Sequence, residues 1–161
     1  MLYIMMTETS IKELTTDDSN LRKFNHNTTL LIFQLMKIYP DDQDLQVYKD
    51  KFEWSQRINA RLACEKFITE AAPFINEIMT ENEEFFLNMD YNNYTDNKGY
   101  IQLLHKVADL WKSSHNKKLK KNIWRYFKIL IIYGIKITRR RDLAEIVNVY
   151  RKKKNQPLLT V

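Results

Sequence analysis

Residue types that commonly carry out chemistry are few in this chain. It has three histidines, His26, His105 and His115, and a single cysteine, Cys64. Zinc sites place pairs of Cys or His a few residues apart, and this chain has no such pair. We therefore interpret the histidines as ordinary polar residues and Cys64 as a small buried apolar residue. One cysteine cannot form an intramolecular disulfide, which fits a reducing compartment.

The acidic side chains have a simpler explanation than catalysis. Glu81, Glu83 and Glu84 fall near an expected helix start, where a carboxylate interacts favourably with the positive end of the helix dipole. The sequence has no glycine-rich phosphate loop, no Gly-x-Ser-x-Gly elbow and no His-Glu-x-x-His zinc motif. We predict a protein that is not an enzyme, with no catalytic residue, no metal site and no cofactor.

Charge is the most informative feature of the sequence. Residues 1–97 hold nine Lys/Arg against 17 Asp/Glu, a net charge of −8. Residues 98–161 hold 17 Lys/Arg against three Asp/Glu, a net charge of +14, so the whole chain carries +6. An asymmetry of this size predicts a basic surface that attracts an anionic partner.

The basic residues form three clusters in the last 45 residues. The first opens an expected helix, where positive charge opposes the helix dipole, and this favours a use other than local stability. The second spans the junction of the last two expected helices, and the third closes the final helix. The candidate binding residues are Lys117, Lys118, Lys120, Lys121, Arg125, Lys128, Lys136, Arg139, Arg140, Arg141, Arg151, Lys152, Lys153 and Lys154.

Two functions from different classes fit these clusters. The first is sequence-independent association with DNA or RNA through phosphate contacts, since no helix-turn-helix, zinc-finger, RNA-recognition or KH signature accompanies the charge. The alternative is a structural or interaction protein that uses the basic region on an acidic protein surface or on another copy of itself. The clusters could also be a solvated surface with no partner. Trp124, Arg125 and Tyr126 are the residues whose rings and charge we would test for base stacking.

Composition and periodicity predict the elements that position these residues. With only two glycines and three prolines in 161 residues, turn-rich sheet folds are disfavoured. Apolar residues recur three and four positions apart, which predicts helices. The stripe of the second helix includes Ile58, and that of the last includes Ile146. The expected helices run over about 18–39, 41–72, 74–79, 80–89, 101–111, 117–137 and 141–153.

These helices are expected to form an all-α protein, a single compact bundle of about five to seven helices. Residues 1–17 are predicted to be a flexible arm, 18–154 the helical domain, 90–98 its clearest loop, and 155–161 a frayed tail. The longest apolar run, 129–137, is about half the length of a membrane span, so we expect no transmembrane segment. Residues 1–6 lack the basic start of a secretion signal, which predicts an intracellular protein.

Two segments suggest a relationship. FITEAAPFINEIMTENEEFF (67–86) and LWKSSHNKKLKKNIWRYFKIL (110–130) resemble, in sequence and in order, small uncharacterised helical proteins of nucleocytoplasmic large DNA viruses. The two segments cover about a quarter of the chain, and the basic C-terminus is denser here than in that pattern. The resemblance implies a non-enzymatic viral protein located in the host cytoplasm, in viral factories or in the virion, where a minor virion component or a host-factor-binding module is an alternative. Bcl-2-like bundles are similar in size and class, but their Asn-Trp-Gly-Arg motif does not occur here.

Overall fold

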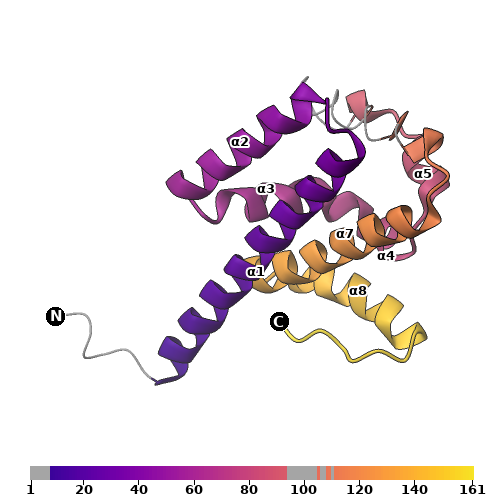
Figure 1. Ribbon diagram of the computed structural model, residues 1–161. Helices are drawn as coiled ribbons and strands as arrows, with labels where there is room; N and C mark the ends of the chain where they lie inside the picture. The colour runs from indigo at the N-terminus through magenta and orange to yellow at the C-terminus, as the bar shows by residue number, and fades with distance from the viewer. Residues whose placement is uncertain (1–7, 94–104, 106–107, 110) are drawn as a thin grey trace.

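Helix is the only regular structure in residues 8–93, 105, 108–109 and 111–161, which are the residues that the computed structural model describes. Within these residues the expected all-α bundle is confirmed (Figure 1). The first helices are α1 (Glu8–Ile38), α2 (Gln43–Ile58) and α3 (Leu62–Ala71). The short elements η2 (Ala72–Phe74), α4 (Ile75–Met79), α5 (Glu83–Leu87) and η3 (Tyr91–Asn93) follow, and the chain ends with α7 (Lys117–Thr138) and α8 (Arg141–Lys153).

The long helix α1 begins ten residues before its expected start. It starts at Glu8, so the prediction of a flexible arm is wrong for residues 8–17, and residues 1–7 lie outside the described part of the chain. The segment 8–17 has no apolar stripe, and periodicity therefore gave no signal there. It also has no glycine or proline, so an established helix can propagate through it. Figure 1 shows this end of α1 projecting beyond the other helices.

The expected long second helix is two helices separated by a turn at residues 59–61. Asn59 has an extended backbone, with φ −151° and ψ 104°, and its side-chain oxygen accepts a hydrogen bond from the Arg61 backbone N–H at 3.0 Å. Asparagine side chains compete in this way with helical hydrogen bonding. The turn changes the direction of the chain, and Ile58, which we expected to be inward, is 67% exposed.

The hydrophobic core is organised around α7, which contacts α1, α3, α4 and α8. On one side of α7, Ile131 and Ile135 are fully buried among residues of α3, α4 and α8. On another side, Ile123 and Leu130 pack with Phe24 of α1. Each such fully buried aliphatic side chain stabilises the fold by roughly 1.5–3 kcal/mol. The packing of the core therefore determines which sides of α7 are exposed to solvent.

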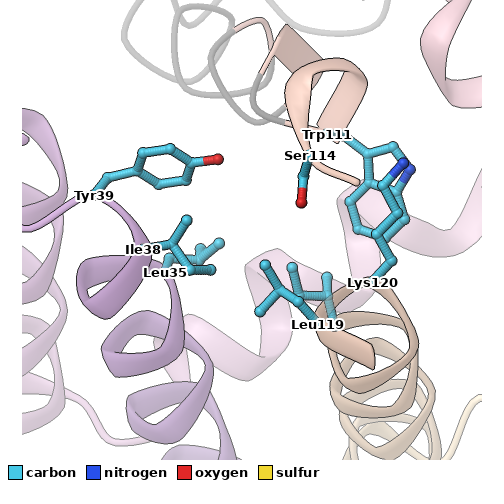
Figure 2. Close-up of a pocket in the computed structure, with 8 residues that line it drawn as sticks. Leu35, Ile38, Tyr39, Trp111, Ser114, Leu119 and Lys120 are labelled. Atoms are coloured by element: carbon cyan, nitrogen blue, oxygen red, sulfur yellow. The ribbon is translucent and has the colours of Figure 1, made fainter. Parts of the chain in front are cut away.

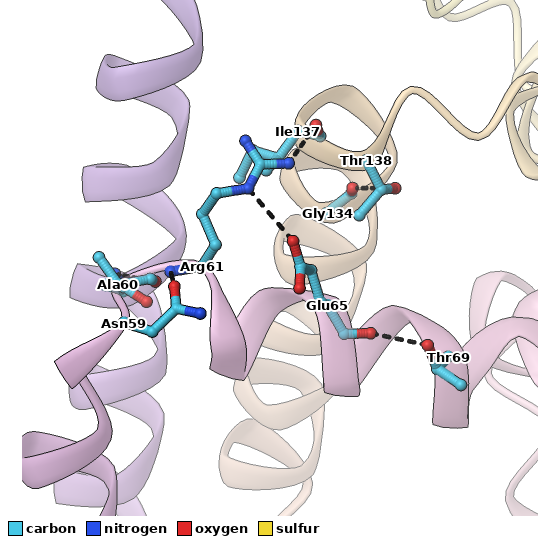
Figure 3. A network of polar contacts seen from close by, with 9 residues as sticks. Asn59, Ala60, Arg61, Glu65, Thr69, Gly134, Ile137 and Thr138 are labelled. Carbon is cyan, nitrogen blue, oxygen red and sulfur yellow. Dashed lines mark hydrogen bonds and ion pairs between the residues drawn. The ribbon is translucent and has the colours of Figure 1, made fainter.

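Helix α3 approaches α7 very closely at Gly134. A Cβ atom placed on Gly134 would lie 2.4 Å from Cγ1 and Cδ1 of Ile68, well inside van der Waals contact. One turn further on, the Arg61 guanidinium donates from Nη2 to the backbone oxygen of Ile137 at 3.3 Å and from Nε to Glu65 at 3.2 Å (Figure 3). A cation at the carboxyl end of α7 complements the helix dipole. These contacts join the start of α3 to the end of α7.

Left-handed backbone ends several helices without glycine. Glu81 after α4, Arg139 after α7 and Asn155 after α8 all have φ of 53–54°. After α8, the Gln156 backbone N–H bonds the oxygen of Arg151 at 2.9 Å, the pattern of a Schellman cap. Positions with a left-handed backbone are usually occupied by glycine, because a Cβ atom disfavours this conformation.

The C-terminal segment is packed against α8, so the prediction of a frayed tail at 155–161 is wrong. Leu159 is 7% exposed and belongs to the core beside α8. The Asn148 side chain donates to the Leu159 backbone oxygen at 3.0 Å and accepts from its N–H at 2.7 Å. The Schellman cap turns the chain back, and one buried leucine with two hydrogen bonds then holds it.

The last two helices, α7 and α8, have the expected bounds to within one residue. Ile146 of α8, expected to be buried, is 40% exposed, since the core-facing side of this helix carries Leu143, Ala144 and Val147. Most of the expected helix 101–111 and loop 90–98 lies outside the described residues.

No helix among those described is long and apolar enough to cross a membrane.

Candidate nucleic-acid interface

The first half of α7 presents four cations on its solvent side. Asn116 caps the helix by accepting a hydrogen bond from the Leu119 N–H at 3.1 Å, which places the following lysines in the first turns. Arg125 lies nine residues before Gly134 and therefore on the side of α7 opposite α3, since each residue turns a helix by about 100°. The exposed residues of this side define the α7 basic face: Lys117, Lys118, Lys121 and Arg125.

The α7 basic face has no acidic partner in the part of the chain that the structure describes. None of its four side chains forms an ion pair within the described residues, and the first turn of α7 contains no Asp or Glu. The face extends over about 12 Å of the helix axis, a length along which duplex DNA carries about seven phosphates. Lys136 lies on the same side of α7, about 16 Å beyond Arg125 along the axis.

Two other lysines of α7 are largely covered and are paired with acids, although Lys128 lies on the same side of the helix as Lys121 and Arg125. The Nζ atom of Lys120 is 3.2 Å from a Glu83 carboxylate oxygen and 5.3 Å from the centre of the Trp111 ring. The Nζ atom of Lys128 is 3.1 Å from Glu81. Both side chains are only 22% exposed. We therefore assign Lys120 and Lys128 to the stability of the bundle and not to its basic face.

The C-terminal cluster approaches α7 through Tyr150. The ring centre of Tyr150 lies 5.5 Å from the Lys128 Nζ and 6.0 Å from the Lys154 Nζ. Lys152, Lys153 and Lys154 are exposed. Arg151 of the same cluster is half-buried and donates to the Pro157 backbone oxygen at 2.8 Å, so it holds the C-terminal segment.

The cluster at the α7–α8 junction is largely paired with acids. Arg139 forms an ion pair with Asp17 of α1 at 3.1 Å, and Arg140 donates a bidentate pair of hydrogen bonds to Asp142 at 2.8 and 2.9 Å. The hydrogen bonds from Arg140 hold the pKa of the exposed Asp142 carboxyl below its ordinary value. Arg141 is exposed and has no ion pair with any described residue. The structure thus places fewer available cations at this junction than the sequence suggests.

The aromatic residues near the basic face belong to the core. Trp124, whose ring we selected for a test of base stacking, packs against Phe86 and Trp111, with ring centres 5.8 and 5.5 Å apart. Tyr126 is half-buried in the same core. Trp54 of α2, by contrast, is 63% exposed. The spacing of Val47, Trp54 and Ile58, seven and four residues apart, was the signal for an exposed apolar row that the sequence analysis did not use.

The described residues give no indication of a metal site or a reactive thiol. No group of three or more His, Cys, Asp or Glu residues among those described could hold a metal ion. Cys64 is fully buried, and burial raises the pKa of its thiol to about 12, which makes it unreactive at neutral pH. A cavity between the end of α1 and the start of α7, lined by Tyr39, Ser114 and Leu119 among others, offers about 20 Å³, room for one water molecule (Figure 2).

The fold and this site together define an all-α bundle with a cationic helix face that no acidic side chain of the described residues pairs with. No protein-family model, no curated protein and no solved structure matches the chain. The resemblance to helical proteins of large DNA viruses therefore stays a prediction.

Proposed function

We propose that this protein is a non-enzymatic nucleic-acid-associated protein that binds phosphates without reading base sequence. The observation that supports the proposal is the division of charge along α7. The two largely covered lysines, Lys120 and Lys128, are paired with Glu83 and Glu81, whereas the four cations of the α7 basic face are exposed and have no acidic partner in the described chain.

Phosphate binding explains a feature that is unfavourable for the isolated protein. Three lysines in the first turns of α7 oppose the helix dipole, and like charges three or four residues apart repel each other by a few tenths of a kcal/mol per pair. A bound polyanion offsets both the repulsion between the lysines and the helix dipole and the repulsion among the lysines, because the positive helix end and the lysines then attract the same phosphates. Contacts of this kind release counterions and carry no sequence information.

The test is a salt titration of binding to a labelled random-sequence duplex. We compare the wild type with a variant in which Lys117, Lys118 and Lys121 are changed to Gln. Each lost phosphate contact reduces the slope of log affinity against log salt concentration by about 0.9, so we expect the slope to fall by about 2.7. Lys120 is left unchanged because its pairing with Glu83 supports the fold.

A matched control removes the same charge from another surface. Lys23, Lys37 and Lys66 are exposed residues of α1 and α3, and their change to Gln also lowers the net charge by three. The control is expected to keep most of the wild-type slope. Equal slopes in the two variants would show that net charge alone draws the duplex. Absence of binding by the wild type at low salt would refute the proposal.

An interaction or structural role is the second candidate, and an exposed apolar row on α2 favours it. A location in viral factories or virions rests on the sequence resemblance and belongs to the same set of proposals. The two roles are compatible, since α2 packs on α1 and α3 while the α7 basic face points away from α3.

A further inference from the structure

Helix α2 exposes three large apolar side chains on its outer side. Val47, Trp54 and Ile58 are 49%, 63% and 67% exposed and lie within about 40° of one another around the helix. We call these three residues the α2 apolar row. The opposite side of α2 packs against α1 and α3, where Leu45 is buried. In Figure 1, α2 lies at the outer edge of the bundle.

The α2 apolar row is not required by the fold. Its side chains are outside both clusters of buried core residues, and no ring contact of Trp54 occurs among the described residues. Scattered exposed apolar residues are common, but a tryptophan and two aliphatic residues aligned on one helix side are typical of protein contact surfaces. Tryptophan in particular is enriched among residues that dominate binding energy.

The charges beside the row identify what fits against it. Asp50 and Arg57 lie on the same flank of the row, both are exposed, and neither forms an ion pair with a described residue. Lys51 lies within the row itself, between Val47 and Trp54. A partner that fits this surface therefore has its own row of apolar side chains. It also has a cation that faces Asp50 and an acid that faces Arg57, at matching positions along the helix axis. A second α2 in antiparallel orientation has this arrangement.

Two-fold symmetry makes the match explicit. When two α2 helices lie antiparallel with the symmetry axis midway between residues 52 and 53, Val47 of one copy is level with Ile58 of the other. Lys51 is then level with Trp54, within reach of a cation–π contact. Asp50 is offset from Arg57 by two residues, about 3 Å along the axis, which long side chains span. Because of the two-fold axis, each of these contacts occurs twice in the dimer.

We propose that two copies of this protein associate through antiparallel packing of α2 against α2, with the α2 apolar row at the centre of the contact. A single helix pair buries less surface than the roughly 1,200–2,000 Å² of stable complexes, so the dimer is weak and forms at micromolar or higher concentration. The proposal does not depend on nucleic-acid binding, since α2 and the α7 basic face lie on different sides of the bundle.

Sedimentation equilibrium over about 5–500 µM, without nucleic acid, tests the proposal. The wild type is expected to show a reversible monomer–dimer equilibrium. Changing Trp54 and Ile58 to Ala is expected to weaken it at least about tenfold, equivalent to 1.4 kcal/mol. Both residues are exposed, so the fold is retained, and circular dichroism verifies this. The control changes Val149 of α8, which is 59% exposed, to Ala and leaves the equilibrium unchanged.

Charge exchange identifies the orientation. Asp50→Arg and Arg57→Asp each place like charges together twice, and each alone is expected to weaken the dimer. The double variant restores it, and a mixture of the two single variants forms a heterodimer. A monomeric wild type at 500 µM would overturn the proposal, as would a dimer that the Trp54 and Ile58 changes leave intact. A dimer that loses no affinity in either charge variant would refute the antiparallel arrangement.

Discussion

Replacing Gly134 by alanine tests how tightly α3 is packed on α7. Two effects of opposite sign act at this position. Alanine favours a helix interior over glycine by about 1 kcal/mol, because glycine loses more backbone freedom on folding. The new methyl group, however, would lie 2.4 Å from Cγ1 and Cδ1 of Ile68, a side chain that is only 1% exposed. Overpacking of this kind typically destabilises a protein by about 1–3 kcal/mol.

We expect the steric effect to win, so that Gly134→Ala lowers the free energy of unfolding by up to about 2 kcal/mol. Ile68 cannot move freely because it lies within the core formed by α3, α4, α7 and α8. Both of the atoms that would clash belong to the Ile68 side chain, and the next atom, Cε2 of Phe24, is at an ordinary 3.8 Å. Removing the Ile68 branch should therefore remove the whole penalty.

The assay is urea unfolding of four proteins, followed by circular dichroism: the wild type, Gly134→Ala, Ile68→Ala and the double variant. Ile68→Ala alone is expected to destabilise by about 2–5 kcal/mol because it leaves a cavity. In that background Gly134→Ala should stabilise by about 1 kcal/mol, since its methyl group enters the cavity and helix propensity improves. The coupling energy is then about 1–3 kcal/mol. If Gly134→Ala stabilises both backgrounds equally, the close approach of α3 to α7 is refuted.

Three further changes test other contacts. Arg61→Ala removes the hydrogen bond to the Ile137 carbonyl and should lower the free energy of unfolding, measured with urea, by about 1 kcal/mol. An unchanged free energy of unfolding would show that this hydrogen bond does not stabilise the fold. Leu159→Ala should destabilise by about 2 kcal/mol, and Asn148→Ala should increase proteolysis of the C-terminal segment. Because the pKa of Cys64 is raised from 9.0 to about 12, the unfolded chain loses its thiol proton first, so stability should fall as pH rises from about 9 to 12. This slope should be smaller in Cys64→Ala, and rapid alkylation of the native thiol at pH 8 would contradict its burial.

The helices that carry the basic residues could be predicted well because their local signals agree. In α7, an asparagine cap and an apolar stripe coincide. The errors arose where one of these signals was absent or was overridden. The turn at Asn59 interrupts an apolar spacing that continues across it, and so Ile58 was placed inward. The early start of α1 and the packed C-terminal segment are supported by helix propagation and by Leu159, which periodicity does not detect.

For the candidate site, the sequence predicts where cations are abundant but not which of them are available. Helical spacing separates Lys120 from Lys117, Lys118 and Lys121, yet the partner that neutralises it, Glu83, lies 37 residues away. Arg139 and Asp17 are 122 residues apart. Ion pairs between residues so distant in sequence depend on how the helices pack, which the local pattern does not determine.

The left-handed residues Glu81 and Arg139 are also the ones that tie distant helices together. Glu81 pairs with Lys128, and Arg139 pairs with Asp17, each from a backbone with φ of 54°. Glycine at either position would relieve about 1 kcal/mol of backbone strain and delete an exposed ion pair worth up to about 1 kcal/mol. The two effects nearly cancel, so a mutational scan of stability would record both positions as neutral. Neutrality there would conceal two compensating roles and would not mean that the residues are idle.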